Sequence, residues 1–375
     1  MNLMNRFYSL LVLLLVGSAS LLAQDDPFPD ASTAAAKYDS NMCIIARVMM
    51  NGEAVTDATV AAYCGDEFRG KQIAGADPKD PTLVFLMAYG GYTGKKQYMH
   101  FRVYTNGRIY IYNSDPDLVY FMDTMLGKVS SPYIIDITPV NLADNGDNTD
   151  VLTTQNGENR NVFLTGRTLY RDGDWNTLCL PFDVTLDGSE LQGATARPLT
   201  NASISGSTLN LTFGEPVDML KAGTPYIIKW EESETDIVNP FFAGVTIDAT
   251  DRSFDNEADD DTRVRFVGTY QTKMFDANDY SVLMLGAQNK LYYPSRGAGI
   301  GAQRAYFKLG GDETRMSRLT SFIMDFSDGE TTGIISISSP IHPEGGCYTL
   351  DGRKLSQKPA TRGVYIVNGK KIIIK

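Results

Sequence analysis

Side chains that commonly perform catalysis are scarce in this 375-residue chain. A serine or cysteine nucleophile usually takes a histidine as its base, and the only histidines are His100 and His342. His100 shares the polar side of an alternating segment with Tyr98 and Arg102, while His342 is flanked by prolines. We predict that both histidines face solvent and that the chain is not an enzyme.

Carboxylates offer two other kinds of chemistry. A glycoside hydrolase requires two carboxyl groups that face each other across a cleft, and the sequence does not reveal such a pair, so this function is the least favoured. An acidic segment also supplies closely spaced oxygen ligands for calcium: Asp255, Glu257, Asp259 and Asp261. The segment does not match a twelve-residue calcium loop, so a solvated loop is the alternative. Calcium is the one cofactor that the sequence allows.

Aromatic residues gather around one loop. Tyr89, Tyr92 and Tyr98 surround a segment that contains Gly90 and Gly91. A tyrosine ring has an apolar face and a polar hydroxyl, so an exposed group of rings can stack on a sugar. These three residues are the candidate ligand-binding site for a glycan, and the alternative is that they belong to the core of a β module.

The four cysteines follow no zinc or haem spacing. Cys43 and Cys64 fall on segments that we expect to be neighbouring strands, so a disulfide between them is a possibility in an oxidising compartment. Cys179 and Cys347 lie in different expected domains, and we predict that they are buried free thiols.

Short alternation of apolar and polar residues recurs along the chain, separated by Asn-Gly and Asp-Gly pairs that favour tight hairpin turns. The strands expected from this pattern are Cys43–Met50, Ala58–Cys64, Thr82–Ala88, Gln97–Tyr104, Arg108–Asn113, Thr208–Phe213, Val264–Thr269, Ser281–Leu285, Arg304–Lys308 and Thr320–Phe326. Many short strands at this spacing predict an all-β fold of tandem β-sandwich modules, Ig-like or jelly-roll-like, with a small C-terminal β tail.

Composition divides the chain into segments. We expect a signal peptide at 1–23, an N-terminal β-sandwich module at 38–138, a linker at 139–160, a second β-sandwich module at 161–328, a linker at 329–346 and a C-terminal β tail at 347–375. The signal peptide rests on Arg6, on the apolar run from Leu10 to Val16 and on the small residues that end at Ala23. That run is too short to span a bilayer, and we expect no transmembrane helix after cleavage.

The net charge of −11 and the isoelectric point near 4.8 describe an acidic protein. Such a surface repels phosphates, so nucleic acid is excluded as a partner. The C-terminal segment reverses this sign, because only Asp351 opposes its basic residues. The basic residues are Arg353, Lys354, Lys358, Arg362, Lys370, Lys371 and Lys375.

The tail also carries a family resemblance. Its order DGRK, at 351–354, followed by GVYIVNGKK, at 363–371, resembles the C-terminal sorting domains of the type IX secretion system in exported Bacteroidota proteins. The resemblance implies a signal that the export machinery recognises. The residues that match it are Gly363, Tyr365, Asn368, Gly369, Lys370 and Lys371. The segments 60–70 and 164–184 likewise resemble recurring Bacteroidota surface modules, which implies all-β folds without known catalytic residues.

These features together predict an exported protein, either secreted or displayed on the exterior of the outer membrane. We expect it to act without catalysis in adhesion or in contact with host or extracellular matrix. A glycan-binding accessory protein is the alternative. The expected partners are the export machinery and a surface or glycan ligand whose identity the sequence leaves open.

Overall fold

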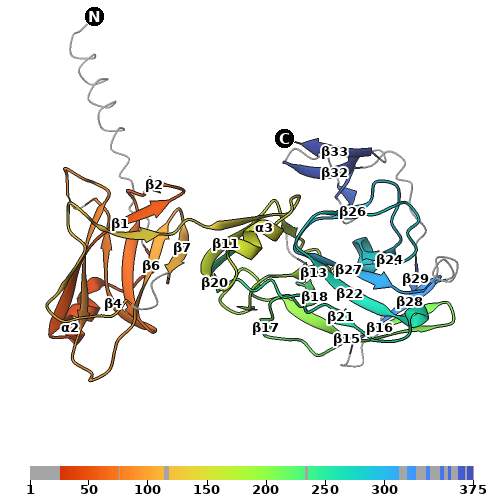
Figure 1. Cartoon of the computed structure of the whole chain (residues 1–375), viewed down its shortest axis with the longest axis horizontal. Helices are drawn as coiled ribbons and strands as arrows, with labels where there is room; N and C mark the ends of the chain where they lie inside the picture. The colour runs from red at the N-terminus through yellow and green to blue at the C-terminus, as the bar shows by residue number, and fades with distance from the viewer. Residues whose placement is uncertain are drawn as a thin grey trace, which may run out of the picture. The chain divides into compact units, whose positions relative to one another are not determined.

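The computed structural model describes residues 26–75, 77–113, 118–232, 235–311, 319–326, 335–337, 347–349, 354–355, 362–367 and 370–374. The chain divides into two compact units, Met1–Ile137 and Thr138–Lys375, which Figure 1 shows in colours from red to blue along the chain. The signal peptide predicted at 1–23 lies outside the described residues, as do His342, Asn368 and Gly369. Within the described residues, no helix has the length and apolar character needed to cross a membrane.

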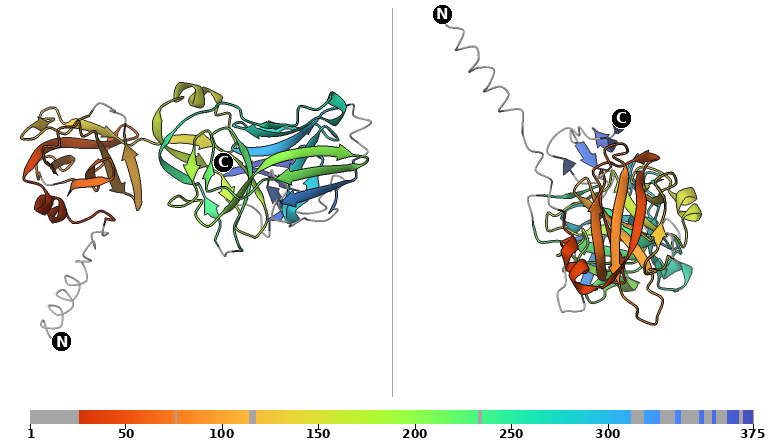
Figure 2. Two further views of the ribbon diagram at one scale, coloured as in Figure 1. Left: turned by 90° about the horizontal axis from the view of Figure 1, so that it is seen from below. Right: turned by 90° about the vertical axis from the view of Figure 1, so that its left-hand side faces the viewer.

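The first unit is built almost entirely of strands. Its elements are α2 (Ala31–Lys37), β1 (Ser40–Met50), β2 (Glu53–Ala54), β3 (Thr59–Cys64), β4 (Glu67–Ile73), β5 (Leu83–Gly90), β6 (Met99–Thr105), β7 (Arg108–Tyr112), β8 (Met125–Leu126) and β9 (Tyr133–Asp136). One sheet is centred on β1, which pairs with β2, β5, β8 and β9, and the second has the order β4-β3-β6-β7. Every strand that the sequence predicted here is confirmed, whereas β2, β4, β8 and β9 were not predicted. Figure 2 shows this unit from a second and a third direction.

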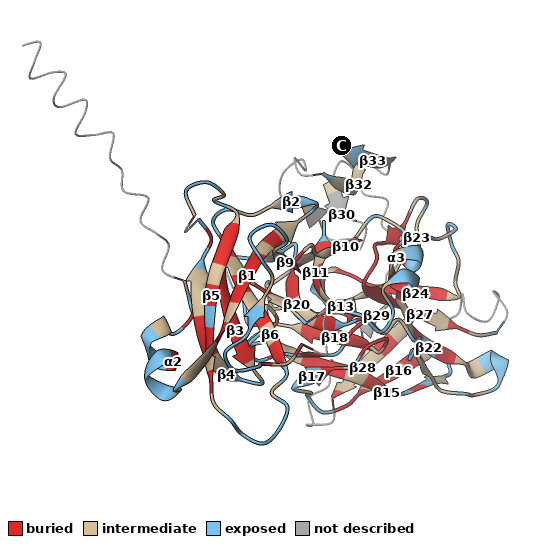
Figure 3. Cartoon of the chain, turned by 60° about the vertical axis from the view of Figure 1, so that its left-hand side comes forward, coloured by how far each residue is buried: buried red, intermediate tan, exposed pale blue. Residues whose placement is uncertain are grey.

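The core of the first unit lies between these two sheets. On β1, Ile44 and Val48 are fully buried, and on β6, Phe101 and Val103 are fully buried. The rings of Phe101 and of Tyr133 on β9 lie 6.0 Å apart, which connects the two sheets directly. Figure 3 shows the resulting alternation of buried and more exposed residues along β1 and β5. The unit is a β-sandwich, as the sequence predicted.

The second unit is larger and is again mostly β-structure. Its elements before the tail are β10 (Val140–Ala143), α3 (Thr149–Thr154), β11 (Asn159–Thr165), β12 (Thr168–Leu169), β13 (Asn176–Cys179), β14 (Val184–Thr185), β15 (Thr195–Ser205), β16 (Thr208–Phe213), β17 (Met219–Leu220), β18 (Pro225–Lys229), β19 (Ile237–Val238), β20 (Phe241–Thr246), β21 (Phe254–Asp255), η1 (Asp260–Thr262), β22 (Val264–Thr269), β23 (Lys273–Met274), β24 (Val282–Leu285), η2 (Ala287–Asn289), β25 (Leu291–Tyr292), β26 (Gly299–Ile300), β27 (Arg304–Leu309), β28 (Ser321–Phe326) and β29 (Ile335–Ser336).

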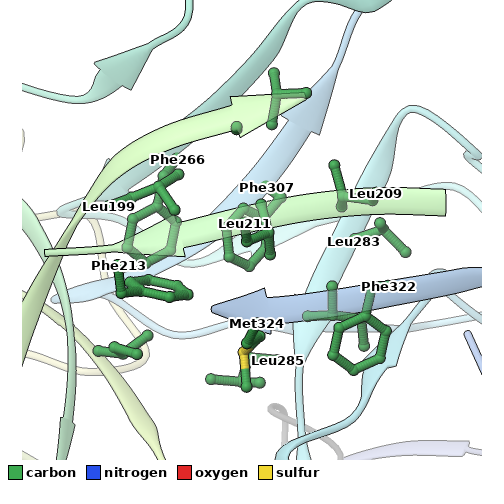
Figure 4. Close-up of a cluster of buried hydrophobic side chains, with 14 of the residues drawn as sticks. Leu199, Leu209, Leu211, Phe213, Phe266, Leu283, Leu285, Phe307, Phe322 and Met324 are labelled. Atoms are coloured by element: carbon green, nitrogen blue, oxygen red, sulfur yellow. The ribbon is translucent and has the colours of Figure 1, made fainter. Parts of the chain in front are cut away.

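Two sheets of the second unit enclose its main core. One has the order β13-β18-β15-β16-β28-β29 and the other the order β21-β22-β27-β24-β25. Phe213 on β16 meets Phe266 on β22 edge to face, with ring centroids 6.4 Å apart. Figure 4 shows the side chains that surround this contact. Leu211 on β16 and Met324 on β28 are in register and fully buried in this core.

The segment 139–160 is not a linker, which corrects the sequence-based division. It forms β10 and α3 and begins β11, and β10 pairs with β11 in parallel. Leu142 and Leu152 enter a buried cluster of this unit. Asn148 connects the segment to the rest of the unit, because its side-chain amide donates to the carbonyl of Tyr270 at 2.8 Å. The polar composition therefore reflects hydrogen bonding within a folded segment.

The segment 329–346 also contains structure that the sequence did not predict. Residues 335–336 form β29, which pairs antiparallel with β28 at the edge of a sheet. Residues 338–346 lie outside the described part of the chain.

The tail forms a small sheet of its own. Its strands, β30 (Cys347–Thr349), β31 (Lys354–Leu355), β32 (Gly363–Val367) and β33 (Lys370–Ile374), take the order β31-β30-β32-β33. It consists of two hairpins, β30–β31 and β32–β33, which pair with each other through β30 and β32. Gly363 and Tyr365 lie on β32, and Lys370 and Lys371 lie on β33.

Candidate binding face of the first unit

The outward side of the β1 sheet carries the most unusual surface of the first unit. Side chains alternate along β1, so those of Met42, Ile44, Ala46 and Val48 point into the sandwich and are buried. The intervening side chains, from Asn41 to Met49, therefore point outward, and of these Ile45 is itself buried. We call this side of the sheet, formed by β1 and its paired strands, the outer face.

A row of sulfur-containing side chains crosses the outer face. Cys43 on β1 is in register with Met87 on β5 and with Met125 on β8. Residues opposite one another in adjacent strands share a face, so the three side chains lie on the same side. Met87 is 38% exposed and Met125 is 61% exposed. We call these three residues the methionine row.

Backbone hydrogen bonds hold the neighbouring apolar residues in place. The amide of Cys43 donates to the carbonyl of Thr124 at 2.9 Å, and the amide of Asp123 donates to the carbonyl of Asn41 at 2.8 Å. These bonds fix the segment that presents the exposed side chains of Phe121 and Met122. Phe121 and Met122 thus add exposed apolar side chains on a segment that is attached to β1.

A groove with a volume of about 610 Å³ opens further along the same face. Charged, polar and apolar side chains line it. The lining residues are Arg47, Met49, Gly52, Ala54, Asp80, Thr82, Ile134 and Asp136. Arg47 is in register with Ile134, and Met49 with Asp136, so β1 and β9 supply its floor. The hairpin between β1 and β2 supplies one side: Asn51 and Gly52 both adopt positive φ there, as the sequence pattern predicted.

Arg47 is held at the groove by two neighbours. Its Nη2 donates to the Asp80 carboxylate at 2.7 Å, and its Nε donates to the Thr82 hydroxyl at 2.8 Å. The Thr82 hydroxyl in turn donates to Asp80 at 2.5 Å. The pKa of Asp80 is lowered below its ordinary value, first by the Thr82 hydroxyl and then by the Thr82 backbone amide and the Arg47 guanidinium. Arg47 therefore has a fixed position and a neighbouring opposite charge.

The structure separates the three tyrosines that the sequence grouped as a glycan site. Tyr89 is in register with Asn41 and lies on the outer face. Tyr98 directly precedes β6 and, by alternation, lies on the side of His100, on the opposite surface of the sandwich. Tyr92 occupies the intervening loop and is 86% exposed. The three residues therefore do not form one flat stacking platform.

A buried arginine anchors the base of this loop. Arg69 is almost fully buried, and its Nη2 donates to the Gln97 side chain at 2.6 Å. Gln97 then donates to the carbonyl of Gly91 at 2.9 Å. The Arg69 guanidinium also lies 4.5 Å from the centre of the Tyr38 ring. The loop that carries Tyr92 is thus fixed at its ends.

The acidic segment at 255–261 is not assembled as a cation site. The Asp255 carboxylate accepts hydrogen bonds from Nε and Nη2 of Arg263, and Glu257 adopts positive φ in the turn that follows. Asp259 precedes the short helix η1, whose first turn contains Asp261. Among the described residues no group of three or more histidine, cysteine or acidic side chains could hold a metal ion.

The structure does not bear out the disulfide considered between Cys43 and Cys64. Both residues have free thiols. Cys43 lies on β1 and Cys64 lies on β3, which belong to different sheets rather than to neighbouring strands. Cys179 is a buried free thiol, as predicted, and burial raises its pKa to about 12. Cys347 is a free thiol but only half-buried.

His100 lies on the outward side of β6, as predicted, but it is half-buried rather than fully exposed to solvent. Its ring stacks on the ring of Tyr63 with centroids 5.8 Å apart. The Arg102 guanidinium lies over the same tyrosine ring, 4.2 Å from its centroid. Burial, helped by the positive charge of Arg102, lowers the pKa of His100. The residue is therefore a packing element of the outer side of β3 and β6.

The chain is an all-β protein whose described residues form two sandwich units. Comparison with protein-family models, with curated proteins and with solved structures found no match. Any function must therefore be argued from the geometry of the outer face and from the features of the sequence.

Proposed function

We propose that this chain is an exported, surface-displayed and non-catalytic protein that adheres to host or matrix proteins through the outer face of its first unit. Export and display rest on the signal-like N-terminal segment and on the sorting-like tail. The single observation that carries the binding role is the methionine row, which places the exposed side chains of Met87 and Met125 in register on either side of Cys43.

Exposed apolar side chains of this kind are suited to a protein partner. The exposed parts of Met87 and Met125 are apolar area that binding would remove from water. Methionine is flexible and polarisable, so it adapts to varied partner surfaces. The sheet beneath Met87 and Met125 is rigid, because β1 pairs with β5 along eight residues. The row is thus an adaptable surface on a fixed support.

A glycan is the second candidate and has weaker support. Sugar binding favours exposed aromatic rings that share one face, and the structure distributes Tyr89 and Tyr98 to opposite surfaces. On the outer face the aromatic residues are Phe85 and Tyr89 of β5, and both rings are half-buried, so neither is fully open to a sugar. Tyr92 remains available as a single ring.

The test compares two surfaces on the purified protein. A panel of extracellular matrix proteins and a glycan array are probed with the wild type and with a Met87→Ser, Met125→Ser double variant. The matched control is Met219→Ser, because Met219 in the second unit has the same 38% exposure as Met87. We expect at least one matrix protein to bind the wild type and the control but not the double variant. Matrix binding that the double variant retains, or binding to glycans only, would contradict the proposal.

A further inference from the structure

The methionine row brings one thiol and two thioethers together on the outer face. Met87 on β5 and Met125 on β8 lie in register with Cys43 from its two sides. Cys43 is a half-buried free thiol, and both methionines are exposed, so all three side chains are at least partly open to solvent. Thiol and thioether sulfur atoms are ligands for soft metal ions, which gives this group a chemistry of its own.

The backbone holds both methionines close to the thiol. The amide of Cys43 donates to the carbonyl of Thr124 at 2.9 Å, so the hydrogen-bonding groups of Cys43 point toward β8. Its pairing with Met87 is therefore of the antiparallel kind without hydrogen bonds, in which the Cα atoms are only about 4.5 Å apart. Met125 lies one strand spacing away on the other side, at about 4.8 Å. A methionine side chain has three rotatable bonds, so both thioethers can turn toward the Cys43 thiol.

The types of ligand favour one class of metal ion. Thiolate and thioether sulfur suit Cu(I), whereas calcium and magnesium take oxygen ligands. A zinc site would use cysteine, histidine or carboxylate groups, and the described residues contain no such group of three or more that could hold a metal. The pairs next to the row are Asn41 with Tyr89 and Ile45 with Phe85. Neither pair adds a carboxylate or an imidazole.

The balance of charge favours a monovalent ion. A thiolate carries one negative charge and a thioether carries none, so the three ligands and Cu(I) form a neutral group. A divalent ion would leave a net positive charge beside Ile45 and Phe85, where an unpaired charge costs free energy. Cu(I) replaces the proton of the Cys43 thiol on binding, so one proton is released and no electron is transferred.

We infer that Cys43, Met87 and Met125 form a binding site for one Cu(I) ion, with the thiolate and the two thioethers as its three ligands. The site goes beyond the proposed adhesion, because it requires sulfur and not only apolar area. Replacing a methionine by leucine conserves volume and apolar character but removes the thioether. The two functions can therefore be separated at the same positions.

The test measures the affinity of the full chain for Cu(I) by competition with the coloured chelator bicinchoninate, under nitrogen and with ascorbate. We expect the wild type to bind one equivalent tightly. Cys43→Ser should weaken binding by at least about 100-fold, and Met87→Leu and Met125→Leu by about tenfold each, because even a change outside the ligand set costs about 10–100-fold in metal affinity. Two matched controls should retain the wild-type affinity: Cys64→Ser, at another half-buried free thiol, and Met219→Leu, at the same 38% exposure as Met87.

A second measurement needs no variant and stays decisive if a variant fails to fold. One equivalent of Ag(I), a soft monovalent ion that keeps its oxidation state, should block alkylation of Cys43 and leave that of Cys64 unchanged, as read by mass spectrometry. Equal protection of the two thiols, or protection of neither, overturns the inference. Binding that Cys64→Ser weakens as much as Cys43→Ser does, or that both leucine variants retain in full, would show an isolated thiol rather than a site.

The outcomes separate this inference from the proposed function. If the leucine variants lose Cu(I) but still bind a matrix protein, both conclusions stand. If Cu(I) does not bind and matrix binding still depends on Met87, only the protein-binding function stands. If Cu(I) binds as expected and no matrix protein binds, the metal site stands without it.

Discussion

Gly268 and Cys179 provide a sharp test of how the two main sheets of the second unit pack. Gly268 lies on β22 and Cys179 on β13. A Cβ at Gly268 would lie 2.3 Å from Sγ and 3.0 Å from Cβ of Cys179. Ordinary contacts between such atoms are about 3.5–4.0 Å. The backbone at Gly268 is not left-handed, so the effect of a substitution there is steric.

The magnitudes follow from this overlap. Gly268→Ala overpacks a buried site and should lower the free energy of unfolding by about 1–3 kcal/mol. Cys179→Ala removes a buried sulfur and should lower it by about 1 kcal/mol. In the double variant the new methyl group occupies the space that the sulfur vacated. The double variant should therefore be more stable than Gly268→Ala alone, with a favourable coupling of about 1 kcal/mol or more.

Equilibrium denaturation in urea measures all four proteins. Trp175 and Trp230 are the only tryptophans, and both belong to the second unit, so their fluorescence reports that unit separately. If the slope of the free energy of unfolding against urea concentration is the same in all four proteins, their folded and unfolded states can be compared directly. Losses of stability that simply add, within about 0.5 kcal/mol, would refute the contact between β13 and β22 that the structure contains.

Three further predictions concern other parts of the fold. Leu152→Ala, in α3, should lower the free energy of unfolding of the second unit by about 2–5 kcal/mol, because Leu152 is 1% exposed; a change below about 0.5 kcal/mol in urea denaturation would restore the linker interpretation of its segment. Alkylation without reductant, read by mass spectrometry, should modify Cys43 and Cys64 before Cys179, whose pKa is raised to about 12 by burial; a disulfide-linked peptide would contradict this. The lowered pKa of His100 means that the unfolded chain takes up the proton first as the pH falls, so stability should decline below about pH 6.5, and less in His100→Gln; equal declines would show that burial does not affect the histidine.

The strands of both sandwiches could be predicted because their alternation is local. Leu209, Leu211 and Phe213 repeat every second residue, and so do the buried residues of β28. The parallel pairing of β16 with β28 could not be predicted in the same way. More than 100 residues separate the two strands, and alternation specifies a face without specifying a neighbour.

The prediction of a linker at 139–160 was wrong for a different physical reason. Low apolar content usually indicates a segment that cannot bury enough surface to fold alone. Here Leu142 and Leu152 are buried, and Val140 and Val151 pack beside them. Asn148 also satisfies backbone groups, because its carboxamide accepts from the amide of Ala143 at 2.8 Å and donates to the carbonyl of Tyr270. Asp144 adds an ion pair with Arg304, in which both side chains are largely buried. Polar residues that would mark a loop act here as tertiary contacts with residues more than 100 positions away.

The sequence did not indicate the outer face as a candidate binding surface, because the residues of β1 are mostly apolar on both sides. Its sequence from Met42 to Val48 reads as a strand buried on two faces, and only the assembled sheet shows that nothing described covers Met87 and Met125. Apolar side chains that remain this exposed contribute little to folding, because the unfolded chain exposes them too. Their position on β5 and β8, on either side of Cys43 on β1, therefore supports the proposed protein-binding role more than a role in stability. The same reasoning separates them from Ile44 on the same strand, whose full burial ties it to the core.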